Sequence, residues 1–232
     1  MKILKIAFLA FLGICFGVSA QELQQPLEDI PMSNRGYALL KSGEVIEGKI
    51  LTTNSTRGIT QVSLEDGTGT RHKISAKEIY EFAIAMNGAV RLQYLNERGS
   101  SVKKLLSKDQ PTAKPEDFII FRNTSVNGEK ELLLQLLNPD FDEVFEVFFD
   151  PFARKTTALE GEYITWTGDK HRAYFISKNG APLLKVKKGN YDKVFEVLFG
   201  DCQQVFSEVK KPKLEDLGQH INLYNASCSF SN

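Results

Sequence analysis

The sequence predicts an α+β fold made mainly of antiparallel β-structure. Asn or Asp precedes Gly at four places between strand-like runs, and this dipeptide suits the positive φ angles of tight hairpin turns. The four are Asp66-Gly67, Asn87-Gly88, Asn127-Gly128 and Asn179-Gly180. In the last forty or so residues, apolar residues recur every three or four positions, as in amphipathic helices. We therefore expect a small barrel-like N-terminal region, then β-hairpins closed by C-terminal amphipathic helices.

Residues 1–20 have the pattern of a secretory signal peptide. Two lysines supply the positive start, an apolar run follows, and small residues ending at Ala20 precede the polar Gln21. This order predicts cleavage between Ala20 and Gln21. An uncleaved anchor is disfavoured because the apolar run is about half as long as the roughly 20 residues of a membrane span. A lipid-modified Cys15 is disfavoured because bulky Ile14 precedes it.

Residues 21–34 are polar, contain two prolines, and are expected to form a flexible lead-in. The small barrel-like region is expected over residues 35–96. Gly48 falls inside its second strand, where a barrel needs a sharp bend that a side chain would obstruct. Residues 90–95 are expected to pair back on the last strand across the Asn87-Gly88 turn. The predicted strands are 37–41, 45–52, 60–65, 70–75 and 79–86.

A polar stretch separates this region from the next. Residues 97–116 contain Pro111 and Pro115 and are expected to form a linker or long loop. Residues 117–232 are expected to hold β-hairpins followed by helices. The predicted strands of this second region are 118–122, 131–137, 144–149, 163–167, 173–177 and 182–187.

The chain is expected to end in helices. The helical spacing runs from Tyr191 to Val209, and Gly200-Asp201 divides it, with Gly ending one helix and Asp beginning the next. A final helix follows Pro212. Residues 141–149 resemble residues 191–199, but only the first segment is bounded by prolines and rich in β-branched and aromatic residues. We therefore expect two different structures and no true repeat.

Two cysteines, Cys202 and Cys228, remain after removal of the signal peptide. An isolated pair readily forms a disulfide in an oxidising compartment. Helices joined near Pro212 would run back on one another and bring the two cysteines into one neighbourhood. We therefore expect a Cys202–Cys228 disulfide.

Two stretches carry a resemblance to known proteins. Gly36-Tyr37-Ala38-Leu39-Leu40-Lys41-Ser42-Gly43, followed by Val45-Ile46-Glu47-Gly48-Lys49-Ile50, resembles the opening strands of small SH3-like or Sm-like barrels. Together with the ending Leu198-Phe199-Gly200-Asp201-Cys202 and Leu223-Tyr224-Asn225-Ala226-Ser227-Cys228, the chain resembles uncharacterised exported proteins of Bacteroidetes-type bacteria. The resemblance implies an envelope location and this architecture, and it carries no active-site residues.

Signatures of catalysis and metal binding are missing from the sequence. There is no Cys-x-x-Cys, no Gly-x-Ser-x-Gly and no phosphate-binding glycine loop. Asn138, Asp140 and Asp142 have the spacing that begins a calcium loop, but its glycine and its final Glu are replaced, so a hairpin turn is favoured. The histidines are scattered: His72, His171 and His220. We predict no catalytic residues, no cofactor and no metal site.

The balanced charge and the predicted export limit the range of possible functions. Basic and acidic residues balance at 29 each, which gives no reason to expect nucleic acid as a partner. We predict an exported protein, periplasmic or at the cell surface, without a stable membrane span after cleavage. Its expected role is non-catalytic binding or structural, with another envelope protein, a peptide or a glycan as partner. The alternative is a periplasmic hydrolase with dispersed acidic catalytic residues, since carboxylate pairs leave no local spacing rule.

Overall fold

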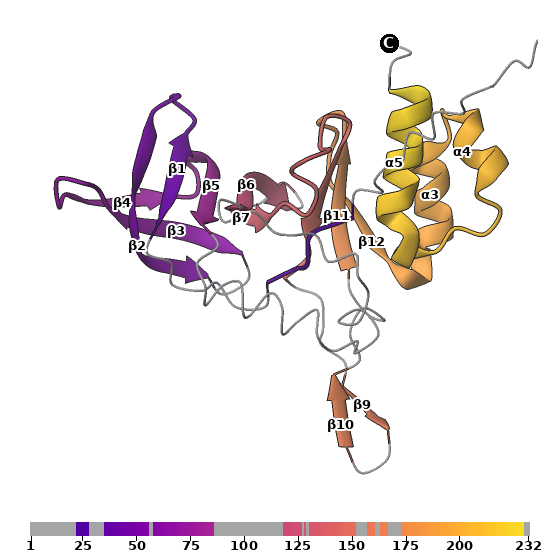
Figure 1. The fold of residues 1–232 in the computed structure, drawn as a ribbon, viewed down its shortest axis with the longest axis horizontal. Coiled ribbons are helices and arrows are strands. Elements are labelled where there is room, and N and C mark those ends of the chain that lie inside the picture. The colour runs from indigo at the N-terminus through magenta and orange to yellow at the C-terminus, as the bar shows by residue number, and fades with distance from the viewer. Residues whose placement is uncertain are drawn as a thin grey trace, which may run out of the picture.

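The computed structural model describes residues 22–27, 35–55, 58–85, 118–126, 128, 130–151, 157–160, 163–166 and 173–229. These residues form a mainly antiparallel α+β fold, as predicted. Figure 1 shows its layers side by side, with a barrel, a second sheet and a layer of helices following one another. None of the helices over the described ranges is long and apolar enough to cross a membrane.

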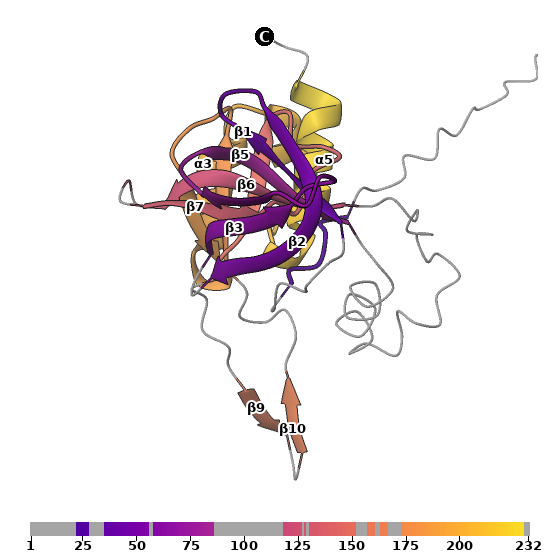
Figure 2. The same ribbon diagram turned by 90° about the vertical axis from the view of Figure 1, so that its left-hand side faces the viewer.

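A closed barrel forms the N-terminal layer. Its sheet has the order β2-β1-β5-β6-β7-β3-β4, and an additional β2–β3 pairing closes it (Figure 2). The strands are β1 (Gly36–Leu40), β2 (Val45–Ser55), β3 (Ile59–Glu65), β4 (Arg71–Ser75), β5 (Ile79–Ala85), β6 (Phe118–Val126) and β7 (Lys130–Gln135). Aliphatic and aromatic side chains from all of these strands fill its interior. The first five strands match the predicted ones to within a few residues.

β2 changes partner at Gly48, as the barrel requires. Its first residues, up to Gly48, pair with β1, and from Lys49 onward it pairs with β3. A Cβ atom on Gly48 would lie 2.1 Å from the carbonyl oxygen of Glu65. The expected obstruction at this position is therefore present, and it explains why the residue is glycine.

The hairpin β6–β7 completes the barrel. It lies beyond residue 96, where the barrel region was predicted to end. β5 pairs with β1 on one edge and with β6 on the other. The predicted pairing of residues 90–95 with β5 is therefore wrong, because both edges of β5 are taken. Residues 90–95 themselves lie outside the described residues.

The second sheet has the order β12-β11-β8, with β8 at Phe145–Phe149, β11 at Ala173–Lys178 and β12 at Leu184–Lys187. A bridge between Leu136 and Phe148 joins it to the end of β7. The Asn179-Gly180 turn links β11 to β12, and both residues have positive φ angles. A separate hairpin of β9 (Thr157–Glu160) and β10 (Tyr163–Trp166) was expected only in its second strand.

One side-chain amide caps the free edge of the second sheet. Asn190 donates from Nδ2 to the carbonyl of Lys185 at 2.9 Å, and its Oδ1 accepts from the backbone N–H of Lys187 at 2.7 Å. These two bonds lie on the side of β12 that β11 does not use. The amide thus occupies the position where a neighbouring strand would bond.

The helices cover the second sheet. They are α3 (Tyr191–Phe199), α4 (Gln203–Glu208) and α5 (Leu217–Cys228), with short 3-10 turns at Lys188–Asn190 and Leu214–Asp216. α3 packs its apolar side, which includes Phe195 and Phe199, into a core shared with β8 and β11. Residues 141–149 hold β8 whereas residues 191–199 are helical, so the two similar segments differ in structure as predicted.

Replacing Gly48 by Ala tests the bend in β2. We expect a loss of about 2 kcal/mol in the free energy of unfolding, because the added methyl group overlaps backbone of β3. Gly67→Ala is the matched control, since a Cβ there has no neighbour within 4 Å. Urea unfolding of the two variants measures the difference, and equal stabilities would contradict this account of the bend.

Candidate functional site

A β-bulge prepares the outer face of the barrel for the main polar cluster. Leu39 pairs with Glu81 and Leu40 with Ile79, so Tyr80 is an extra residue on β5. The extra residue lets both Ile79 and Phe82 point into the barrel, although their spacing would place them on opposite faces of a regular strand. Tyr80 and Glu81 are left outside, and Glu81 lies directly opposite Arg122 on β6.

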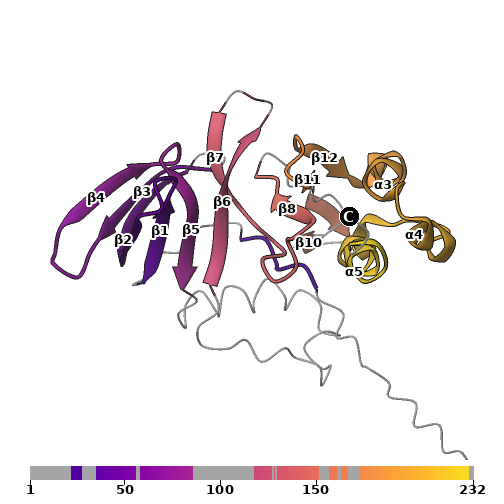
Figure 3. The same ribbon diagram turned by 90° about the horizontal axis from the view of Figure 1, so that it is seen from above.

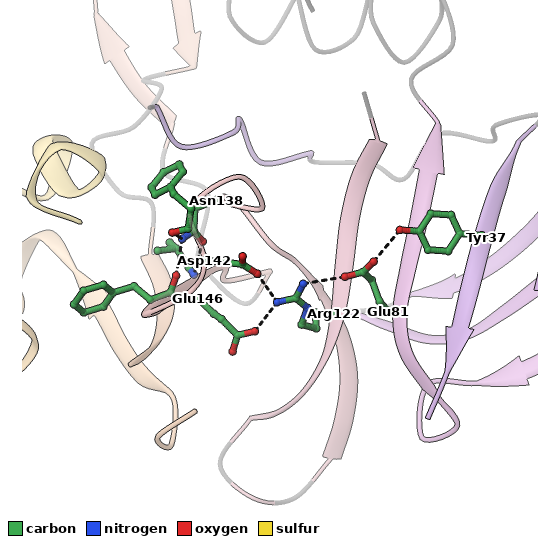
Figure 4. Close-up of polar contacts among 9 residues, drawn as sticks. Tyr37, Glu81, Arg122, Asn138, Asp142 and Glu146 are labelled. Atoms are coloured by element: carbon green, nitrogen blue, oxygen red, sulfur yellow. Dashed lines mark hydrogen bonds and ion pairs between the residues drawn. The ribbon is translucent and has the colours of Figure 1, made fainter. Parts of the chain in front are cut away.

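Arg122 gathers three carboxylates from two layers of the molecule. Its Nη2 donates to Glu81 Oε2 at 2.9 Å, and its Nη1 donates to Asp142 Oδ2 at 2.6 Å and to Glu146 Oε1 at 2.8 Å. Glu81 belongs to the barrel, whereas Asp142 and Glu146 belong to the second layer (Figure 4). The side chain of Arg122 is only 17% exposed. We call these four residues the Arg122 cluster.

The electrostatics of the cluster keep Arg122 charged. Burial opposes its charge, but the hydrogen bonds to Glu146, Glu81 and Asp142 outweigh burial and raise the pKa of Arg122. Tyr37 extends the cluster by donating its hydroxyl to Glu81 Oε1 at 2.8 Å. Burial and this carboxylate raise the pKa of Tyr37 to about 12, so the phenol stays a neutral donor.

Asn138 fixes the loop that carries Asp142. Its Nδ2 donates to the carbonyls of Phe141 and Phe145, and its Oδ1 accepts from the backbone N–H of Val147. Asn138 is fully buried, so these bonds replace lost hydration. The predicted reading of residues 138–142 as a turn fits this geometry, since Asn138 and Asp142 already have protein partners.

An N-terminal strap, residues 22–27, crosses between the barrel and the second sheet (Figure 3). The backbone N–H of Gln24 donates to the Leu137 carbonyl at 2.6 Å. The buried amide of Gln135 makes two more bonds, accepting from the Leu27 N–H at 2.7 Å and donating to the Gln25 carbonyl at 3.0 Å. A flexible lead-in was expected over residues 21–34, but residues 22–27 are held in place by these bonds. The sequence signal for this is Gln135, a polar residue within a run of leucines, whose side chain bonds the strap backbone.

Apolar side chains anchor the strap at both ends. Leu27 is buried in the barrel core, and Leu23 packs against the core under the helices. The strap therefore contacts both the barrel core and the core under the helices.

The helical layer is held by a second polar group and by the cysteines. Lys178 donates to both carboxylate oxygens of Asp201 at 2.7 Å and lies over the ring of Tyr224, whose hydroxyl also bonds Asp201. Burial opposes the charge on Asp201, but the bonds from Lys178 and Tyr224 lower its pKa. Cys202 and Cys228 lie at disulfide distance with Cα atoms 5.9 Å apart, which agrees with the predicted pair.

His72 and His220 lie in different layers of the molecule. His72 Nε2 lies 2.7 Å from Asp66 Oδ2 at the β3–β4 turn, and His171 lies outside the described residues. His220 on α5 is buried, with Tyr191 Oη 2.7 Å from its Nδ1. Its ring packs against three aromatic rings of α3, those of Tyr191, Phe195 and Phe199.

The polar contacts described above join the barrel to the second sheet and the second sheet to the helices. Over the described ranges, no group of three or more His, Cys, Asp and Glu side chains is arranged to hold a metal ion. The predicted cleavage residues Ala20 and Gln21 lie outside the described residues.

Comparisons with protein-family models, with curated proteins and with solved structures found no match to this chain.

Replacing Arg122 by Met tests the Arg122 cluster. We expect a loss of about 3 kcal/mol in the free energy of unfolding, because three carboxylates would lose their shared cation in a poorly hydrated place. Lys41→Met is the matched control, since its ion pair with Glu131 is exposed and contributes less than about 1 kcal/mol. Urea unfolding measures both, and a similar small loss for both variants would contradict a central role for Arg122.

Buried His220 makes stability depend on pH. Burial lowers its pKa below the usual 6.5, although Asp216 opposes this. The unfolded chain therefore binds the proton first, so this contribution is complete above pH 6.5 and is lost as the pH falls towards the folded-state pKa, at up to about 1.4 kcal/mol per pH unit. His220→Gln can still accept from Tyr191 and should weaken this slope. Identical slopes in urea unfolding series would refute the assignment.

Proposed function

We propose that this chain is an exported envelope protein that acts by binding or by a structural role, without catalysis. The observation that carries the proposal is the Arg122 cluster, in which three carboxylates from two layers share one guanidinium. A hydrolase would need such carboxylates for its substrate, as acid and base or nucleophile. Here one oxygen of each carboxylate bonds Arg122, and this shared cation joins the barrel to the second sheet.

Export is supported by two independent features of the chain. Residues 1–20 have the charge, the apolar run and the small residues that signal peptidases recognise. The Cys202–Cys228 pair at disulfide distance suits an oxidising compartment. Both features favour the periplasm or the cell surface.

A binding role is favoured over a purely structural one by the strap. The buried amide of Gln135 and the carbonyl of Leu137, just after β7, already hold a short segment of backbone at the junction of the layers. This is the recognition chemistry of an extended peptide, so a peptide or an extended segment of another envelope protein is the favoured partner over a glycan.

Purified exported protein tests the proposal. We expect an N-terminus at Gln21 by intact mass and no turnover on a panel of glycan, peptide and ester substrates. Cross-linking and mass spectrometry in the native envelope should identify a partner. Reproducible turnover that Glu146→Gln abolishes without unfolding would contradict the proposal and support the hydrolase alternative. Glu22→Gln, a change of an exposed carboxylate, is the matched control.

A further inference from the structure

We infer that the groove beneath the strap is a binding site for an extended peptide, which residues 22–27 fill in the isolated chain and a partner segment takes over. The inference rests on the proposed function, because removal of the signal peptide leaves the strap with a free end. The partner segment has an apolar residue, three residues in extended conformation and a second apolar residue, the pattern of Leu23 to Leu27.

The polar part of the groove recognises backbone atoms. The carbonyl of Leu137 accepts from one strap N–H, while the amide of Gln135 accepts from a second and donates to a strap carbonyl. Gln135 is only 4% exposed beneath the strap, so backbone atoms of the strap take the place of water on its amide. All three bonds are available to any extended segment that provides two N–H groups and one carbonyl at this spacing.

The apolar part of the groove sets the spacing. Leu23 packs against one hydrophobic core and Leu27 is buried in another, so the segment between them must span the junction of barrel and second sheet. An incoming segment must bury an apolar side chain in each core. The leucines at the first and fifth positions and the buried Pro26 at the fourth give selectivity, whereas Gln24 and Gln25 bond through their backbone.

The strap contributes no strand to the sheets on either side of it. It is followed by residues 28–34 before the barrel begins at β1, and only Gln21 would precede it after cleavage at Ala20. The strands and helices form their sheet pairings without it. A peptide must compete with the strap of the same molecule, so its apparent affinity is reduced by the fraction of molecules with an open groove.

The test uses the full mature chain and a fluorescent peptide with the sequence of residues 21–28. The Leu27→Ala protein keeps its strap but anchors it poorly, because a buried Leu→Ala change weakens such an anchor more than tenfold. We expect the peptide to bind this variant at least about 10-fold more tightly than the wild type. Glu22→Ala is the matched protein control and should bind the peptide as the wild type does, since Glu22 is exposed. The peptide with Asp in place of both leucines should not bind.

Hydrogen exchange on the wild-type chain gives a second measurement that does not depend on the variant folding. Saturating peptide should accelerate exchange of the Gln24 and Leu27 amides, which lose their acceptors when the strap is displaced. Unchanged protection of these amides, with no binding to a folded Leu27→Ala protein, would overturn the inference.

Other outcomes separate this inference from the proposed function. A concentration-dependent dimer of the Leu27→Ala protein without peptide would identify a second copy as the occupant and overturn the inference in this form. Envelope cross-links that map away from the strap, with no peptide binding, would overturn the peptide site and leave the binding role standing. Enzymatic turnover together with peptide binding would overturn the proposed function and support the peptide site.

Discussion

From Leu132 to Gln135, strand β7 is buried on both of its faces, and the rest of the molecule is arranged around this constraint. Leu133 points into the barrel, while its neighbours Leu132 and Leu134 point into a separate core that Phe148 and Phe175 of the second sheet complete. A strand that is apolar on both faces needs cover on both. The barrel alone would leave one face of the hairpin exposed, so the second sheet is a requirement of the barrel's own sequence. The Arg122 cluster and the strap lie at the junction that this requirement creates.

Most elements were predictable because their signals are local. Alternation, glycine turns and helical spacing located nearly all the described strands and all of the longer helices. The pairing partners of the strands were harder to predict. No local pattern shows that β6, and not residues 90–95, pairs with β5, because that pairing depends on how strands distant in the sequence complete the barrel. The similar segments 141–149 and 191–199 show the strength of context, because flanking prolines and the apolar period decided between strand and helix.

The polar junction was harder to predict than the fold. Glu81 meets Arg122 only because a bulge at Tyr80 shifts the register of β5, and no local spacing encodes that shift. Asp142 drew attention as a calcium ligand, yet its partner is a guanidinium that lies 20 residues away in the chain. The cysteine pair could be predicted because only two cysteines lie outside the predicted signal peptide.

The amide of Asn190 has a consequence for how this protein behaves among copies of itself. A strand laid along β12 would satisfy one edge and create another, and repetition of that step builds a polymer. A side-chain amide makes the same two bonds but has no far side on which a further strand could form. The second sheet therefore ends at β12 in a group that cannot propagate it, and one residue next to a short strand protects this edge from strand-to-strand assembly at high local concentration.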